Sequence, residues 1–179
     1  MEHFWHNVPG WFHAQDLYSR MVSAAVDGSL FVEVGSWKGA SASFMGVEIE
    51  NSNKAIQFWC VDTWAGSPEL MDDPDVVAGT LVDVFFKNTD PVARHIRPLR
   101  MPSVSAATQF DDLTCDFVYI DADHSYEAVK ADIKAWLPKV KVGGTLAGDD
   151  CNFHDVKRAV NELLPDHTID GENWVWVKK

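Results

Sequence analysis

The chain has 179 residues, a length that suits one domain over residues 1–179, and its 46% hydrophobic and 23% charged residues are typical of a globular protein. Lys and Arg number 15 against 27 Asp and Glu, so the formal net charge is −12. This charge repels the phosphates of nucleic acids and anionic membranes, and it favours a small neutral or cationic partner.

Helix-like and strand-like patterns alternate along the chain. In the first half, the pattern predicts helices at 13–26, 38–50 and 75–86 and strands at 30–34 and 56–61. In the second half, the pattern predicts strands at 93–99, 117–120 and 145–148 and helices at 103–110, 125–137 and 155–164. Residues 167–169 and 174–177 then flank the turn signal Asp170-Gly171 and predict a hairpin.

This alternation predicts an α/β fold with a Rossmann-like arrangement. Apolar strands that alternate with helices form a mostly parallel sheet with helices on both faces, and the hairpin adds an antiparallel strand at the edge. We therefore expect seven strands. In open sheets of this kind ligands bind outside the carboxyl ends of the strands, so the residues that follow each strand are the candidates for function.

The cysteines and the N-terminal segment indicate the compartment. Cys60, Cys115 and Cys151 form no CxxC pair, and residues 1–12 lack the basic start and unbroken apolar core of a signal peptide. No apolar run reaches the roughly 18 residues of a membrane span. We expect reduced thiols in a cytoplasmic protein. The aromatic side chains of 1–12 either cover a ligand site or pack on the core or on a partner subunit.

The turn after the first strand contains an acidic residue and two glycines, in the segment from Glu33 to Gly39. Gly35 permits a tight turn and the close approach of a ligand, and Gly39 permits close packing at the start of the next helix, whose free N–H groups favour an anionic group. Asp62 ends the second strand, 27 residues after Gly35, where an acidic residue binds the ribose hydroxyls in dinucleotide-binding folds. Each feature alone also fits a plain turn or cap, but together they predict a nucleoside ligand.

Aspartates follow two later strands. Asp121 and Asp123 come after the fourth strand, and Asp149 and Asp150 come after the fifth. Carboxylates gathered at the ends of adjacent strands repel one another, and a hard divalent cation with oxygen ligands holds them together. Any one of these aspartates is also explained by solvation or by helix capping. The group as a whole predicts a divalent metal.

Four segments in this order carry a resemblance: FVEVGSWKGAS at 31–41, VDTW at 61–64, IDADHSY at 120–126 and GGTLAGDD at 143–150. Together they resemble class I S-adenosylmethionine-dependent methyltransferases, from about Pro9 onward. The greatest similarity is to the small bacterial group of macrocin and mycinamicin sugar O-methyltransferases. The metal-dependent catechol and caffeoyl-CoA O-methyltransferases are more distant. Four motifs in one order are more specific than any one of them.

The resemblance implies roles for individual residues. The positions that would bind S-adenosylmethionine are Glu33, Gly35, Ser36, Trp37, Gly39, Ser41, Asp62, Thr63, Ser103, Asp121 and Ala122. Among them, Ser41 would hold the methionine carboxylate, Asp62 the ribose, and Ser103 and Ala122 the edges of the adenine. The ligands of Mg²⁺, or of another hard divalent cation, would be Asp121, Asp149 and Asp150. The catalytic residues would be His124 and Asp121.

Two differences from the catechol enzymes bear on the acceptor. Those enzymes have a lysine where this chain has His124 and an asparagine where it has Asp150. Both differences resemble the sugar methyltransferases, so the expected acceptor is a hydroxyl of a small molecule, a sugar or a natural-product glycoside rather than a catechol. No long insertion is present to form a lid. The acceptor site is therefore expected to be open, or to be completed by another copy of the chain in a homo-oligomer.

The expected reaction is metal-dependent methylation of a hydroxyl group. The metal would lower the cost of ionising the hydroxyl, and His124, with an ordinary pKa of about 6.5, would accept its proton. The alternative for His124 is a local role at the start of a helix. Of the other histidines only His154, close to Asp149 and Asp150, has a comparable setting. Two other functions remain open here: a nicotinamide-dependent oxidoreductase, although the turn lacks a full GxGxxG, and a non-catalytic nucleoside-binding protein.

Overall fold

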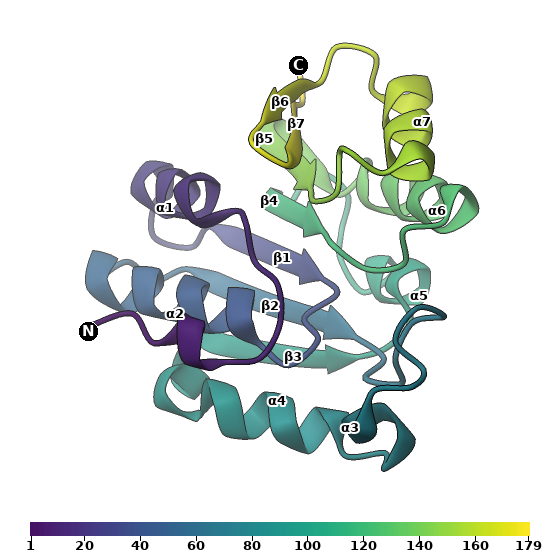
Figure 1. The fold of residues 1–179 in the computed structure, drawn as a ribbon. Coiled ribbons are helices and arrows are strands. Elements are labelled where there is room, and N and C mark those ends of the chain that lie inside the picture. Colours follow the sequence, from purple (N-terminus) through teal and green to yellow (C-terminus); the bar gives the residue numbers. More distant parts are fainter.

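The computed structural model describes residues 1–179 and contains a seven-stranded sheet in the order β3-β2-β1-β4-β5-β7-β6 (Figure 1). The strands are β1 (Leu30–Val34), β2 (Gln57–Asp62), β3 (Ile96–Arg100), β4 (Cys115–Ile120), β5 (Val140–Gly148), β6 (Thr168–Asp170) and β7 (Asn173–Val177). Strands β1 to β5 pair in parallel, and β7 runs antiparallel to both β5 and β6. The predicted mostly parallel sheet with an antiparallel hairpin at its edge is confirmed.

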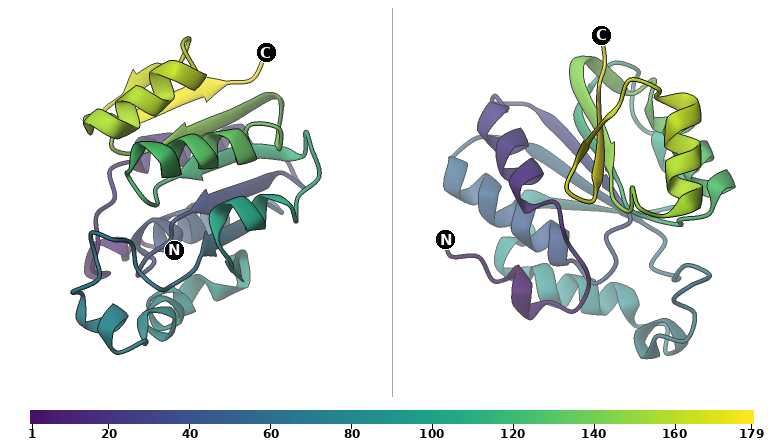
Figure 2. Two further views of the ribbon diagram at one scale, coloured as in Figure 1. Left: turned by 90° about the vertical axis from the view of Figure 1, so that its right-hand side faces the viewer. Right: turned by 45° about the horizontal axis from the view of Figure 1, so that its top comes forward.

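Helices cover both faces of this sheet, as predicted. They are η1 (Trp5–Asn7), α1 (Gln15–Ala24), α2 (Ala40–Ser52), α3 (Pro74–Val77), α4 (Leu81–Thr89), η2 (Asp90–His95), α5 (Ser103–Ala107), α6 (Tyr126–Trp136) and α7 (His154–Leu163). Helices α1, α2 and α4 pack on one face, and α5, α6 and α7 pack on the other (Figure 2). Every helix falls short of the length and apolar character that a membrane crossing requires.

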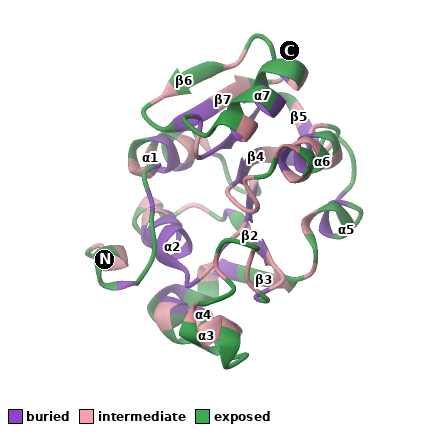
Figure 3. Cartoon of the chain, turned by 45° about the vertical axis from the view of Figure 1, so that its right-hand side comes forward, coloured by how far each residue is buried: buried purple, intermediate pink, exposed green.

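Alternating side chains of the central strands build the two cores. Phe31 and Phe117 belong to the core under α1, α2 and α4, whereas their neighbours Val32 and Val118 belong to the core under α5, α6 and α7. Successive residues of a strand point to opposite faces, so a strand buried on both faces is apolar at nearly every position. Figure 3 shows the buried residues along the sheet and on α2. These two cores fix the strand ends at which the ligand site lies.

Most element boundaries shift by a few residues from the predicted ones, and three of the differences have a clear local cause. The helix expected at 75–86 is divided into α3 and α4, because Gly79 has a φ of +69°, which ends a helix. The strand expected from 93 begins at Ile96, since Pro91 lies in the first turn of η2. Strand β5 begins at Val140 rather than at Thr145, because it pairs with Cys115 before the register shifts. None of these differences moves a strand end that carries a predicted site residue.

The N-terminal segment packs against α2 and the start of α1. Val8 and Phe12 are buried in the α1–α2 core, and Trp5 packs against Phe44 in an edge-to-face arrangement. Trp11, between the two buried residues, is 70% exposed. The segment is therefore anchored on both sides of one exposed tryptophan.

Candidate active site

Two adjoining cavities lie at the carboxyl ends of the central strands. The β2 cavity, of about 300 Å³, is lined by residues that follow β1, β2, β3 and β4, including Asp62, Thr63 and Ser103. The β5 cavity, of about 420 Å³, extends toward Asp149 and Asp150 and is bordered by the N-terminal segment. Both cavities are lined by Gly35, Trp37, Leu70, Asp121 and Ala122. They form neighbouring parts of one site, as expected for ligands at the strand ends of an open sheet.

Gly35 brings the end of β1 into direct contact with the end of β4. Its φ is +88°, and a Cβ atom there would lie 1.8 Å from the backbone oxygen of Asp121. The backbone N–H of Asp121 donates a hydrogen bond to the carbonyl of Val34 at 2.8 Å. Only a residue without a side chain fits between these two backbones. The sequence predicted a turn that depends on glycine here. The structure shows that glycine is needed because the backbone of Asp121 lies against this position.

Asp62 fixes the shape of the turn after β1. Its Oδ2 accepts hydrogen bonds from the backbone N–H groups of Ser36 at 2.9 Å and Trp37 at 2.8 Å, and its Oδ1 accepts one from Trp64 at 2.7 Å. Trp37 has a φ of +46°, a left-handed conformation that is costly for a bulky residue and persists only where the surroundings enforce it. The side chain of Trp64 donates to the carbonyl of Trp37 at 3.0 Å. Asp62 therefore both borders the β2 cavity and shapes its wall.

Glu33 does not line either cavity. It is 1% exposed, and it accepts a hydrogen bond from the hydroxyl of Tyr18 at 2.8 Å. Burial raises the pKa of Glu33 to about 7. Ser36 and Ser41 do line the β5 cavity, at the start of α2. Gly39, the N-cap of α2, packs against α4, where a Cβ atom would lie 2.7 Å from Thr89 Cγ2.

A histidine and two carboxylates meet on the wall of the β5 cavity, and one of them, Asp121, also borders the β2 cavity. His124 Nε2 lies 2.9 Å from Asp150 Oδ2 and 3.8 Å from Asp121 Oδ1, and His124 Nδ1 lies 2.9 Å from Glu69 Oε2. Hydrogen bonding to Asp121 and Asp150 raises the pKa of His124 to about 11, so the imidazole is protonated at neutral pH in this arrangement. Burial raises the pKa of Asp121. Asp150 has a φ of +60°, a left-handed backbone conformation that a non-glycine residue adopts only at a cost.

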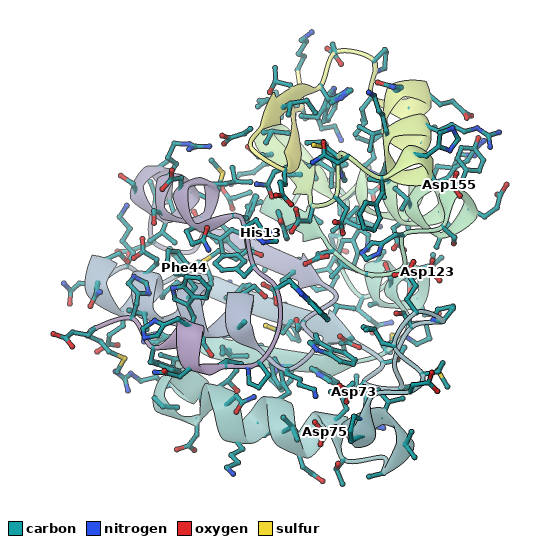
Figure 4. The ribbon with its side chains drawn as sticks, in the orientation of Figure 1. His13, Phe44, Asp73, Asp75, Asp123 and Asp155 are labelled. Carbon is teal, nitrogen blue, oxygen red and sulfur yellow. The ribbon has the colours of Figure 1, made fainter.

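Asp149 faces a second group on the other side of the strand end. Its Oδ2 lies 3.9 Å from His13 Nδ1, which lies 3.4 Å from Glu172 Oε2. Its Oδ1 accepts a hydrogen bond from the backbone N–H of Asp150 at 2.9 Å. Burial, followed by the charge of Asp121, raises the pKa of Asp149 to about 6. Figure 4 shows His13 where the N-terminal segment passes the sheet before α1.

The donor atoms around His124 fit a divalent cation. The facing atoms of Asp121, His124 and Asp150 all lie within 4.8 Å of one another, as do those of His13, Asp149 and Glu172. His124 Nε2 is buried and faces the carboxylates of Asp121 and Asp150, so it lies within reach of a cation that they would hold. Carboxylate oxygens suit Mg²⁺, and an added imidazole also suits transition metals. Of the predicted metal ligands, Asp121 and Asp150 converge with His124, whereas the carboxylate of Asp149 faces the separate group of His13 and Glu172.

The structure also brings in residues to which the sequence gave no role. Glu69, His13 and Glu172 come from three distant segments, and only the tertiary fold places them on the β5 cavity. Asp132, on α6, lines the β2 cavity although it is only 5% exposed. Its position on the apolar face of α6, between Val129 and Ile133, was a signal that sequence reasoning overlooked. His154 lines neither cavity, and its side chain is 88% exposed and pairs with Asp155, which Figure 4 labels on α7.

Comparisons with solved structures show the fold. The O-methyltransferase NovP matches with a TM-score of 0.71 at 19% identity, over 92% of this chain and 79% of that one. A Staphylococcus aureus protein assigned as a caffeoyl-CoA O-methyltransferase matches with a TM-score of 0.66 at 15% identity, over 97% and 87% of the two chains. CalS11, a TDP-rhamnose 3′-O-methyltransferase of calicheamicin biosynthesis, matches with a TM-score of 0.61 at 14% identity, over 92% and 76%.

Comparisons at the level of sequence show the family. The uncharacterized protein y4gI of Sinorhizobium fredii is 25% identical over 126 residues, which are 70% of this chain but only 13% of that longer protein. Residues 32–151 match the family model of a methyltransferase domain, and this segment contains all the strand ends that line the two cavities. The chain belongs to this methyltransferase domain family.

Proposed function

We propose that the chain transfers a methyl group from S-adenosylmethionine to a hydroxyl of a small molecule, with a divalent metal at the site. The observation that supports this most is the join between the two cavities. A pocket suited to a nucleoside meets, at Gly35, Trp37 and Asp121, a second pocket that holds carboxylates and an imidazole. A methyl donor and its acceptor need such adjoining sites, because transfer requires the acceptor oxygen to be aligned with the methyl group.

The β2 cavity and the start of α2 suit the donor. Asp62 and Thr63 follow β2, where an acidic residue binds ribose hydroxyls, and Ser103 and Ala122 border the rest of the cavity. Ser41 lies in the first turn of α2, whose free N–H groups and helix dipole favour the methionine carboxylate. S-adenosylmethionine supplies an activated methyl group on its sulfonium. The protein's contribution is to bind and orient it.

Asp121, Asp149 and Asp150 are the residues that would hold the metal, with His124 beside them. A divalent cation bound there would stabilise the negative charge that develops on the acceptor oxygen. The cluster of carboxylates supports this assignment, because burial already raises the pKa values of Asp121 and Asp149 and so disfavours their charged forms without a cation. Mg²⁺ is the cation we expect, since oxygen donors predominate.

His124 is placed to accept the proton of the acceptor hydroxyl. Its proton is held in the metal-free protein by the carboxylates of Asp121 and Asp150, which raise its pKa to about 11. A cation bound to those carboxylates would reduce this stabilisation, and the imidazole would then titrate closer to its ordinary range. The alternative role as a helix cap has little support, since the backbone N–H of Ser125 at the N-cap of α6 donates to Asp123 and not to His124.

The β5 cavity suits a sugar-like acceptor. Trp11 and Phe153 present aromatic surface at its border, and its polar lining includes Glu69, His13 and Glu172. Apolar faces with a few polar anchors are typical of small-molecule sites, and a sugar ring offers both kinds of surface. The name of CalS11 gives a sugar nucleotide as its substrate, which is consistent with a sugar or glycoside acceptor for this fold.

Binding and turnover test this proposal separately. S-adenosylhomocysteine should raise the melting temperature while NAD should not, because only a ligand of the folded state stabilises it. Transfer of label from S-adenosylmethionine should then be measured over sugars, glycosides and catechols, with Mg²⁺ and with a chelator. Stabilisation by NAD alone would overturn the cofactor assignment. Binding without transfer to any hydroxyl would favour the non-catalytic nucleoside-binding alternative.

A further inference from the structure

A buried carboxylate without a cationic partner lies in the wall of the β2 cavity. Asp132 on α6 is 5% exposed, and none of the residues that line this cavity is basic. Taking a carboxylate out of water is costly unless hydrogen-bond donors replace the water. Burial accordingly raises the pKa of Asp132 to about 6. A position on the apolar face of a helix would accommodate a hydrophobic residue at much lower cost, so the carboxylate calls for a ligand.

The neighbours of Asp132 orient it but do not satisfy it. The indole N–H of Trp136 donates a hydrogen bond to Ser103 Oγ at 3.0 Å, which leaves the hydroxyl proton of Ser103 free to donate to Asp132. No backbone N–H and no other side chain donates to this carboxylate. Each carboxylate offers about four acceptor positions, so Asp132 retains capacity for further donors from the cavity.

The position of Asp132 along the cavity indicates which part of a nucleoside it meets. Ser103 of α5 and Ala128 and Asp132 of α6 line the β2 cavity and not the β5 cavity, so this side of the β2 cavity does not border the proposed acceptor site. Asp62, at the end of β2, takes the ribose in the proposed function. The base therefore extends toward α5 and α6. Adenine carries one exocyclic amine. Its N–H groups are neutral donors, which a buried carboxylate without a cationic partner can accept.

We propose that Asp132 recognises the exocyclic amine of the adenine ring, so that α6 determines which base the cofactor must carry. This inference rests on the proposed use of S-adenosylmethionine. The carboxylate of Asp132 accepts the amine N–H, and the pair Trp136–Ser103 holds it in place. A base with a carbonyl oxygen at the same position would face the carboxylate oxygen and be rejected, because two acceptors are then left without a proton between them.

Calorimetric titration with S-adenosylhomocysteine and S-inosylhomocysteine, which has an oxygen in place of the amine, tests this proposal. The wild type should prefer the adenine compound by about tenfold or more, the usual effect of one buried charge-assisted hydrogen bond. In Asp132→Asn the amide can donate to the oxygen, so the preference should disappear or reverse. Asp123→Asn is the matched control, because Asp123 lines the same cavity with the same charge, and it should keep the wild-type preference.

The outcomes separate this inference from the function on which it rests. If the wild type binds neither compound, the proposed cofactor is wrong. If it binds both equally, or if Asp132→Asn folds and keeps the wild-type preference, only the role of Asp132 is overturned. A preference that changes in Asp123→Asn instead would assign the amine to Asp123. Should Asp132→Asn not fold, Ser103→Ala serves as the second variant, because loss of the orienting hydroxyl should reduce the preference severalfold and an unchanged preference would contradict the proposal.

Discussion

The carboxylate of Asp62 accepts the backbone N–H of Trp37 at 2.8 Å, so a residue at the end of β2 holds the turn that follows β1. The same carboxylate oxygen also accepts the N–H of Ser36. One side chain thus has two tasks, since it supports a strained turn and presents a carboxylate to the β2 cavity. Substitutions at Asp62 should therefore change both stability and binding.

Asp62→Ala should weaken S-adenosylhomocysteine binding by more than tenfold and lower the free energy of unfolding by about 1 to 3 kcal/mol. The first effect follows from loss of a charge-assisted acceptor for the ribose, and the second from backbone N–H groups left without partners. Calorimetric titration measures the affinity and urea unfolding measures the stability. Unchanged affinity in a folded variant would show that Asp62 does not bind the ribose.

Gly35→Ala and Gly28→Ala form a matched pair. Both glycines have a φ of +88°, but a Cβ atom at Gly28 meets nothing within 4 Å, whereas at Gly35 it meets the backbone of Asp121. The left-handed conformation alone should cost about 1 to 2 kcal/mol in Gly28→Ala. Gly35→Ala should lose about 1 to 3 kcal/mol more from overpacking, and methyl transfer as well, because Asp121 is displaced. Equal losses of unfolding free energy in the two variants, measured in urea, would show that the contact between residue 35 and Asp121 has no effect on stability.

Removal of the metal should abolish turnover and leave donor binding nearly intact. Asp121 and Asp150 face the β5 cavity, so a cation there acts on the acceptor more than on the donor. Activity after exhaustive chelation, its recovery on addition of Mg²⁺, and the affinity for S-adenosylhomocysteine in both states provide the measurement. Full activity in the chelated enzyme would exclude a catalytic metal.

His124→Ala should reduce kcat by roughly a hundredfold to ten-thousandfold and remove the acid limb of the pH–rate profile, as expected for a lost general base. The fold and the affinity for S-adenosylhomocysteine should change little. His154→Ala is the control, since that exposed side chain lies away from both cavities. If His124 served only the start of α6, its loss would instead cost about 1 kcal/mol of stability and leave the rate and its pH dependence unchanged.

Glu33→Gln should alter how stability depends on pH. The pKa of Glu33 is raised from 4.5 to about 7, so between these values the folded protein holds a proton that the unfolded chain releases. Stability should therefore fall as pH rises through this window, by an amount on the order of 3 kcal/mol. Urea unfolding of the ligand-free protein at about pH 5 and about pH 8 should show a smaller fall in Glu33→Gln. Glu127→Gln, on the exposed side of α6, should retain the wild-type fall; an identical fall in both variants would contradict the assignment.

The sequence was informative wherever the signal was local. Apolar runs followed by Gly35, Asp62, Asp121 and Asp149 placed these residues correctly at the ends of β1, β2, β4 and β5, because the alternation of strands and helices determines which ends share an edge. The division of the helix at Gly79 was missed, since helical spacing of apolar residues continues across it.

The remaining part of the site depends on tertiary packing. Glu172 lies in the β6–β7 turn and Glu69 in the loop after β2, and neither stands in a motif. Glu33 was expected to contact the cofactor, but the packing of Tyr18 from α1 buries it outside both cavities, an outcome that no local pattern indicates. The position of His13 arises in the same way, from the packing of the N-terminal segment that leads into α1.

Val8 and Phe12 anchor the N-terminal segment on both sides of Trp11, so the side chain at residue 11 can affect selectivity without affecting folding. The two flanking side chains are buried and Trp11 is 70% exposed, so the backbone course of the segment does not depend on which side chain stands at residue 11. That side chain nevertheless forms part of the wall of the β5 cavity. A single nucleotide change in this codon can thus reshape the cavity while the protein remains folded, and saturation mutagenesis at residue 11 offers a direct route to altered acceptor preference.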